Sequence, residues 1–153
     1  MEDFSFSIES LINADKKTVW RHVTQMKNVN AELKPFARMT YPKDRSEIGK
    51  QDVPMNETLF RSFVFLFGFI PADIHNLKLE KLESGTAFHE NSTTLTHKYR
   101  KHTRTLTEQD GKTLVHDEIH FLPRIYPLGH VYLPLIKRIF ENRHTNLRKA
   151  FPD

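Results

Sequence analysis

A chain of 153 residues without a cysteine is the length of one domain, residues 1–153, and it cannot form disulfides, zinc–thiolate centres or a thiol nucleophile. Hydrophobic residues make up 38% and charged residues 27%, a balance that is typical of globular proteins and excludes a disordered or fibrous chain. The 23 basic and 19 acidic residues give a net charge of +4, but the basic residues are dispersed, so we expect no nucleic-acid partner.

The first 35 residues predict one strand and two helices. Residues 4–12 alternate between apolar and polar side chains, which indicates a half-buried strand. Asn13 or Asp15 can cap the helix that follows. Its apolar residues at helical spacing are Val19, Trp20, Val23 and Met26. A shorter helix over residues 28–33 ends before Pro35, because the residue preceding a proline is pushed out of the helical region.

Six further strands are predicted between Phe36 and Leu122, separated mostly by turn residues such as Ser84-Gly85 and Asp110-Gly111. The expected strands are Ala37–Tyr41, Glu57–Phe67, Asp73–Leu82, Thr86–Glu90, Leu95–Thr107 and Lys112–Leu122. Residues 43–55 are polar and patternless, so we expect a loop there.

The Phe60–Phe69 run is apolar on both faces, which favours a strand and neighbouring loop under the last helix. Exposure of this run would instead indicate a contact with a membrane or with a second copy in a homodimer.

One long helix is expected at the end of the chain, starting between Gly129 and Pro134 and running to about Ala150. Its apolar stripe comprises Ile136, Ile139, Phe140, Leu147 and Phe151. The neighbouring strands are joined by short connections, which predicts an antiparallel sheet and an α+β class.

No signal peptide is expected, because the first ten residues lack a basic segment followed by an apolar run. The most apolar segment, Phe60–Ile70, is shorter than the roughly 20 residues that a membrane-spanning helix needs. The sequence therefore predicts a cytoplasmic protein without stable membrane insertion.

The stretch from Arg100 to Phe121 predicts a hairpin around Asp110-Gly111, and the two-residue turn sets its register. The predicted pairs on one face are Leu106 with Val115, Arg104 with Asp117, His102 with Ile119 and Arg100 with Phe121. On the second strand Val115, Ile119 and Phe121 are apolar, whereas His116, Glu118 and His120 are polar. The first set should therefore be buried, which turns Arg100, His102, Arg104 and Asp117 inward.

Charges on a buried face must be paired or lie in a cavity. Arg104 can pair with Asp117 across the strands. Arg143 lies between Phe140 and Leu147 at helical spacing and should share their inward stripe. Three interpretations remain open: a self-contained ion pair with the other arginines reaching the rim, a polar-lined ligand cavity, or a catalytic site.

The order of elements and four segments resemble the SRPBCC or START-related helix-grip superfamily, which includes polyketide cyclase/dehydrase-like and lipid transport-like proteins. The segments are SLINADKKTVWRHVTQMKN, LFGFIP, RKHTRTLTEQDGKTLVHDEIHF and PLGHVYLPLIKRIFENRHTNLRKAF. The last two are similar to a bacterial ligand-binding group with an H-x-H-x-F strand, a T-x-L-x-D strand and a helix ending in F-x-x-R-x-x-x-L. The matching positions are His102, Asp117, Phe140, Arg143 and Leu147. Arg104 and Leu106 replace the group's second histidine and its aromatic residue.

The resemblance implies a curved antiparallel sheet of about seven strands, wrapped around a long C-terminal helix. The implied order is one strand, two helices, six strands and one helix. It also implies a cavity between sheet and helix for an apolar or amphipathic small molecule. Some relatives are cyclases, aromatases or hydrolases, and many only bind or carry a ligand, so the fold alone does not decide the function.

The first functional hypothesis is a binding or carrier protein for a small hydrophobic or amphipathic molecule, without a cofactor. Arginine suits a carboxylate or phosphate at the polar end of such a ligand, because its planar fork donates two parallel hydrogen bonds. The expected ligand-binding residues are Arg100, His102, Arg104, Asp117, Phe121, Phe140 and Arg143.

The alternative is an enzyme acting on a polyketide-like or other carbonyl substrate. His102 would be the general base oriented by Asp117, or Asp117 the base with Arg104 stabilising an oxyanion. The pairing places His102 diagonal to Asp117, which counts against the first arrangement. No metal site is expected: His116 and His120 lie about 13 Å apart on the outer face of a strand. His130 and His144 should lack a carboxylate partner nearby on the same helix face.

Overall fold

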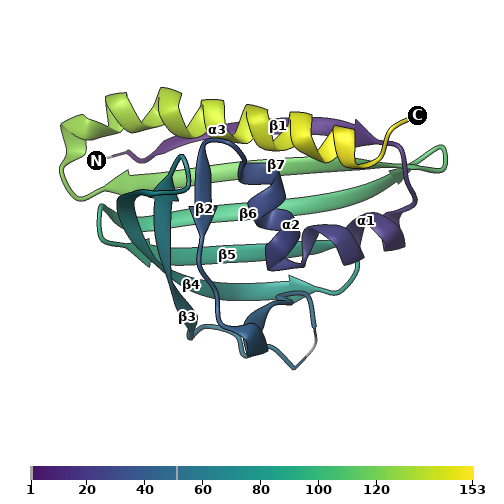
Figure 1. The fold of residues 1–153 in the computed structure, drawn as a ribbon, viewed down its shortest axis with the longest axis horizontal. Coiled ribbons are helices and arrows are strands. Elements are labelled where there is room, and N and C mark those ends of the chain that lie inside the picture. Colours follow the sequence, from purple (N-terminus) through teal and green to yellow (C-terminus); the bar gives the residue numbers. More distant parts are fainter. Residues whose placement is uncertain (1, 51) are drawn as a thin grey trace.

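The computed structural model describes residues 2–50 and 52–153, and it confirms the α+β class. Ten main elements follow one another in the predicted order (Figure 1). They are β1 (Phe4–Ile12), α1 (Lys16–Val23), α2 (Met26–Leu33), β2 (Ala37–Met39), β3 (Thr58–Leu66), β4 (Ile70–Glu83), β5 (Ala87–Thr94), β6 (His97–Gln109), β7 (Lys112–Pro123) and α3 (Gly129–Ala150). Short 3₁₀ turns lie at Lys43–Arg45 and Tyr126–Leu128.

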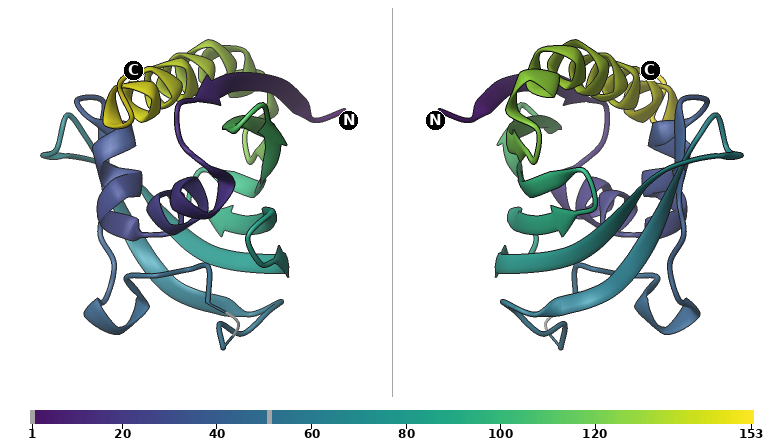
Figure 2. Two further views of the ribbon diagram at one scale, coloured as in Figure 1. Left: turned by 90° about the vertical axis from the view of Figure 1, so that its right-hand side faces the viewer. Right: turned by 90° about the vertical axis from the view of Figure 1, so that its left-hand side faces the viewer.

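The seven strands form one antiparallel sheet in the order β1-β7-β6-β5-β4-β3-β2. Figure 2 looks along the long helix and shows the sheet curled into a half-barrel, with α3 and the α1–α2 pair on its open side. The two edge strands, β1 and β2, do not pair with each other; α3 packs against β1 and α2 instead. This is the helix-grip architecture that the sequence predicts.

The β6–β7 hairpin has the register predicted from its turn. Arg104 lies opposite Asp117 and Leu106 lies opposite Val115. Asp110 and Gly111 both have positive φ, 51° and 79°, as a two-residue turn that matches the twist of the strands requires. The inner face is buried, and Lys101 on the outer face is exposed.

Two asparagines of α3 fasten it to the end of α2. Asn146 donates from Nδ2 to the backbone oxygens of Glu32 (2.9 Å) and Lys34 (2.7 Å), and Asn142 donates to that of Lys34 at 2.6 Å. The last carbonyls of a helix lack partners within it, so these amides satisfy acceptors that would otherwise be unpaired.

The Phe60–Phe69 run is a strand and its neighbouring loop, as predicted, but only part of it faces the cavity that α3 closes. The run forms β3 and the tight β3–β4 turn, near the edge of the sheet. Phe63, Phe67 and Phe69 are 50%, 56% and 73% exposed. Alternation explains the difference, because the inward positions of β3 are taken by Phe60, Ser62, Val64 and Leu66.

The loop and the last helix add two details. The described residues of the 43–55 segment form the expected loop, but Ile48 and Val53 are buried in the core beside α2. Helix α3 begins at Gly129, within the expected range, and Pro134 lies inside it. Within residues 2–50 and 52–153, none of the helices combines the length and the apolar character needed to cross a membrane.

Candidate functional site

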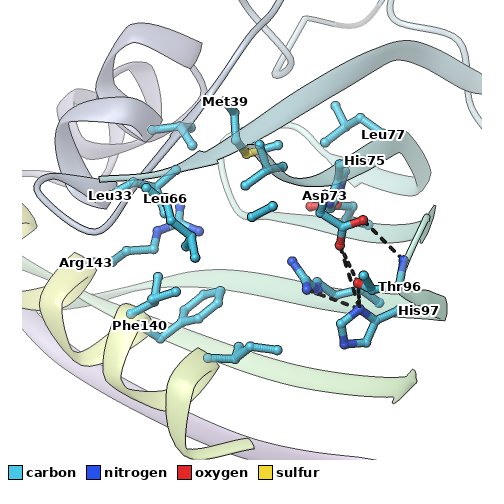
Figure 3. Close-up of a pocket in the computed structure, with 18 of the residues that line it drawn as sticks. Leu33, Met39, Leu66, Asp73, His75, Leu77, Thr96, His97, Phe140 and Arg143 are labelled. Carbon is cyan, nitrogen blue, oxygen red and sulfur yellow. Dashed lines mark hydrogen bonds and ion pairs between the residues drawn. The ribbon is translucent and has the colours of Figure 1, made fainter. Parts of the chain in front are cut away.

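A cavity of about 390 Å³ lies between the concave face of the sheet and α3. Its walls come from α2, from β2 to β6 and from the first two-thirds of α3 (Figure 3). The apolar lining residues are Met26, Val29, Leu33, Ala37, Met39, Ile48, Val64, Leu66, Pro71, Ala72, Leu77, Phe88, Leu135, Ile136, Ile139 and Phe140. Pro71, Ala72 and Leu135 are exposed, which places the mouth between the start of β4 and the first half of α3.

The polar part of the lining is concentrated on β4, β5 and the start of β6. It consists of Asp73, His75, Glu90, Thr96, His97 and Arg100, with Tyr132 and Arg143 contributed by α3. Figure 3 shows Asp73, Thr96 and His97 on one side of the cavity and Leu33, Leu66 and Met39 on another. The cavity is therefore apolar over most of its surface and polar at one wall.

His75 and Glu90 form a hydrogen-bonded pair on this wall. His75 Nε2 lies 2.6 Å from Glu90 Oε2, which also accepts a hydrogen bond from Ser92 Oγ at 2.6 Å. Burial raises the pKa of Glu90, but His75 and His102 outweigh it and the result is a pKa of about 2. Glu90 is therefore ionised at neutral pH.

Asp73 is held by the β5–β6 turn. Thr96 Oγ1 donates to Asp73 Oδ2 at 2.6 Å, and the backbone N–H groups of Ile74 and Thr96 donate to Oδ1. Burial raises the pKa of Asp73, yet these hydrogen bonds and Arg100 leave it below its usual value. His97 next to this turn is fully buried, and burial together with the nearby Arg100 lowers the pKa of His97 to about 4.

A second polar cluster, centred on Asp117, lies behind the cavity lining. Arg104 donates to both oxygens of Asp117 at 2.8 Å, from Nε and Nη2. His102 Nε2 lies 2.7 Å from Oδ1, and His144 Nε2 lies 2.6 Å from Oδ2. Because a carboxylate only accepts, both histidines carry their hydrogen on Nε2.

Glu32 of α2 completes this cluster from the other side. Arg104 donates to its two oxygens at 2.9 and 3.1 Å, and Arg143 Nε donates to Oε1 at 3.1 Å. Burial raises the pKa of Glu32, but the two guanidinium groups outweigh this and lower it. The same balance between burial and Arg104 leaves the pKa of Asp117 well below its usual value. We call Glu32, His102, Arg104, Asp117, Arg143 and His144 the buried ion cluster.

The structure separates the predicted ligand-binding residues into two groups. Arg100, Phe140 and Arg143 line the cavity. His102, Arg104, Asp117 and Phe121 are buried and are not among its lining residues. The predicted Arg104–Asp117 ion pair is confirmed, and Arg143 is buried on the inward stripe as expected.

One geometric expectation is wrong. His102 reaches Asp117 despite its diagonal position, because the imidazole spans the gap between neighbouring pairs of the hairpin. His144 has a carboxylate partner from β7, which spacing within its own helix could not show. Its position was readable from the sequence, since it lies four residues after Phe140 and three before Leu147 on the same stripe.

Sequence reasoning missed Glu32 and the polar wall of the cavity. Glu32 lies three residues after Val29 and next to Leu33, both of which are buried, so helical spacing carried a signal for it. The wall residues carried a signal in the alternation of their strands, because Asp73 and His75 share a face with Leu77 and Leu79, and Glu90 lies two residues after Phe88. Among the residues that the structure describes, no group of three or more His, Asp or Glu side chains is arranged to hold a metal ion.

One family model matches the chain: a domain of unknown function, DUF8410, over residues 10–151. No curated protein matches the sequence. Solved structures with a similar fold include protein CV1439 from Chromobacterium violaceum, with a TM-score of 0.70 and 12% identity over 98% of this chain and 99% of that one.

Two further structures extend the comparison. A START superfamily protein from Mycobacterium smegmatis has a TM-score of 0.65 and 8% identity over 99% of this chain and 97% of that one. Ara h 8.0201 has a TM-score of 0.65 and 11% identity, with 97% of each chain covered. At these identities the comparisons establish similarity of fold alone, and the expected resemblance of the fold to SRPBCC and START-related proteins is confirmed.

Proposed function

The chain belongs to the DUF8410 family, and from its helix-grip fold and its cavity we propose that it binds and carries a small hydrophobic or amphipathic molecule. The observation that carries this proposal is the cavity of about 390 Å³ between the sheet and α3. Ligand sites in proteins are typically hollows of about 300–1,000 Å³ with mostly apolar walls and a few placed polar groups.

The residues around the cavity support this function more than they support a packing defect. Sixteen apolar side chains from two helices, four strands and one loop line a space that a closed core would fill. Interiors of proteins are packed as densely as organic crystals, so an unfilled space of this size lowers stability unless an occupant restores the lost contacts.

We favour binding over catalysis because of where the candidate catalytic groups lie. The enzymatic alternative needs His102, Asp117 and Arg104 within reach of a substrate, but these three are not among the residues that line the cavity. Each of them is also occupied: Asp117 accepts four hydrogen bonds, from Arg104, His102 and His144.

Native mass spectrometry of the protein, purified from its own host, tests the proposal. We expect an additional mass that corresponds to a co-purified apolar or amphipathic molecule. A Leu66→Trp variant fills part of the cavity from β3 and should lose this mass. Phe65→Trp is the matched control: Phe65 lies next to Leu66 on the same strand but does not line the cavity, so this variant should keep the ligand.

A protein that carries no additional mass, and that also shows no saturable binding of the neutral fluorophore N-phenyl-1-naphthylamine, would contradict the proposal. Equal ligand retention in Leu66→Trp and the wild type would contradict the location of the site.

A further inference from the structure

The polar wall of the cavity contains two buried nitrogen atoms without hydrogen-bond partners. Arg100 Nε and His97 Nε2 are both inaccessible and have no partner among the residues that the structure describes. Both residues line the cavity. Such unpaired polar atoms are rare in native proteins and need a specific explanation.

The side chain of Arg100 is less well hydrogen-bonded than that of His97. The closest interaction of its guanidinium is Nη2 with His97 Nδ1 at 3.5 Å, at the limit of a hydrogen bond. In contrast with Arg104 and Arg143, it forms no ion pair with any carboxylate of residues 2–50 and 52–153. The side chain stays half-buried because it faces the cavity.

Two carboxylates share the wall with Arg100, but other donors occupy them. Asp73 accepts hydrogen bonds from Thr96 and Ile74, and Glu90 accepts them from His75 and Ser92. Their attraction does not offset the burial of the guanidinium, which leaves the pKa of Arg100 below its usual value. Among the described residues, the guanidinium of Arg100 therefore has no carboxylate directly bonded to it.

We propose that Arg100 is the recognition site for an acidic end group, so that the ligand of the cavity is an apolar molecule carrying a carboxylate. This inference rests on the proposed function, because it assigns the polar end of the same site. The guanidinium can donate two parallel hydrogen bonds to a carboxylate, and its buried Nε–H gains the acceptor it lacks.

His97 does not supply a donor to this site. Thr96 Oγ1 gives its single hydrogen to Asp73, so His97 Nδ1, which lies 2.8 Å from that hydroxyl, is the donor of the pair. The ring hydrogen is then on Nδ1, and the unpartnered Nε2 is an acceptor. The unpaired N–H group of this wall is therefore that of Arg100, which matches an oxygen-rich anion.

Calorimetric titration with dodecanoate and dodecan-1-ol tests the proposal, since the two probes share an apolar chain and differ in the end group. We expect the wild type to prefer dodecanoate. Arg100→Met should weaken dodecanoate binding about 10- to 100-fold, the range of a hydrogen-bonded charge, and leave dodecan-1-ol within about threefold. Lys98→Met is the matched control, because it removes an exposed cation from the same strand.

The outcomes separate this inference from the proposed function. If neither probe binds to the wild type, both are overturned. If both probes bind and Arg100→Met changes neither affinity, or lowers both equally, the binding function stands and the acid site is overturned.

The thermal stability of the unliganded variant provides a second test. A structural arginine should lower the midpoint when replaced, as a residue of the buried ion cluster would. Arg100 lacks a carboxylate partner, so Arg100→Met should leave the midpoint unchanged or raise it. A clearly lowered midpoint would overturn the assignment of Arg100 to the ligand.

Discussion

Replacing Arg104 by methionine should destabilise the protein severely, because among the described residues it alone bonds both carboxylates of the buried ion cluster. Its guanidinium donates to Asp117 at 2.8 and 2.8 Å and to Glu32 at 2.9 and 3.1 Å. The side chain is fully buried, and methionine is an unbranched apolar substitute. The main effect of the change is therefore electrostatic.

Removing one partner of a buried ion pair costs about 3–5 kcal/mol, since the other charge remains without compensation. In Arg104→Met two carboxylates are affected, although Arg143 still reaches Glu32 and the histidines still reach Asp117. We expect a loss near 4 kcal/mol out of a total of about 5–15 kcal/mol. With a slope of about 2 kcal/mol per molar urea, the midpoint of urea unfolding should fall by about 2 M.

Equilibrium urea unfolding at pH 7, followed by tryptophan fluorescence, measures this loss. Lys101→Met is the control on the outer face of the same strand and should change the free energy of unfolding by less than about 0.5 kcal/mol. A loss below about 1 kcal/mol in Arg104→Met would refute the electrostatic reasoning.

The dependence of folding stability on pH tests the same electrostatic role of Arg104. The pKa values of Glu32 and Asp117 are lowered in the folded state. Their stabilising contribution is therefore fully present above the unfolded values near 4 and is lost as the pH falls through the folded values. The difference in the free energy of unfolding between the wild type and Arg104→Met should become smaller as the pH falls below about 4.

Three further changes have defined outcomes. The pKa of His97 is lowered to about 4, so protonation of this residue should cost the wild type about 3 kcal/mol of stability as the pH falls from 6.5 to 4. Urea unfolding of His97→Gln should lack this loss. Gly129→Ala places its methyl group 2.0 Å from the ring of Phe4, which should cost about 1–3 kcal/mol in the same assay. Asn146→Leu removes one of the two amides that bond the end of α2; because Asn142 still donates to the carbonyl of Lys34, stability should fall by only about 0.5–1.5 kcal/mol.

The sheet was predictable because its side chains alternate and its turns are marked. In the hairpin, one Asp-Gly turn and the apolar residues Val115, Ile119 and Phe121 sufficed to turn Arg104 and Asp117 inward, and both are buried. Such local patterns contain enough information to assign faces and register.

The partners of the inward charges were less predictable, because they come from distant parts of the chain. Glu32 meets Arg104 across 72 residues, and His144 meets Asp117 across 27. Spacing within one element shows which way a side chain points, but it does not show which side chain of another element it meets. For the same reason the sequence placed Arg104 and Asp117 in the ligand site, whereas α2 and α3 enclose them behind it.

Helix α3 is fastened unevenly along its length. Residues 142–147 are bonded to α2, β1 and β7 through the side-chain amides and through Arg143 and His144. Residues 131–139 instead face the cavity on their inner side and expose Val131 and Leu135 on their outer side. Free energies of local opening follow such differences in packing and bonding. Amide hydrogen exchange should therefore be slow in the second half of the helix and markedly faster in the first. The edge strands β1 and β2 share no backbone hydrogen bonds. The first half of α3 can therefore move away from the cavity mouth without breaking hydrogen bonds of the sheet.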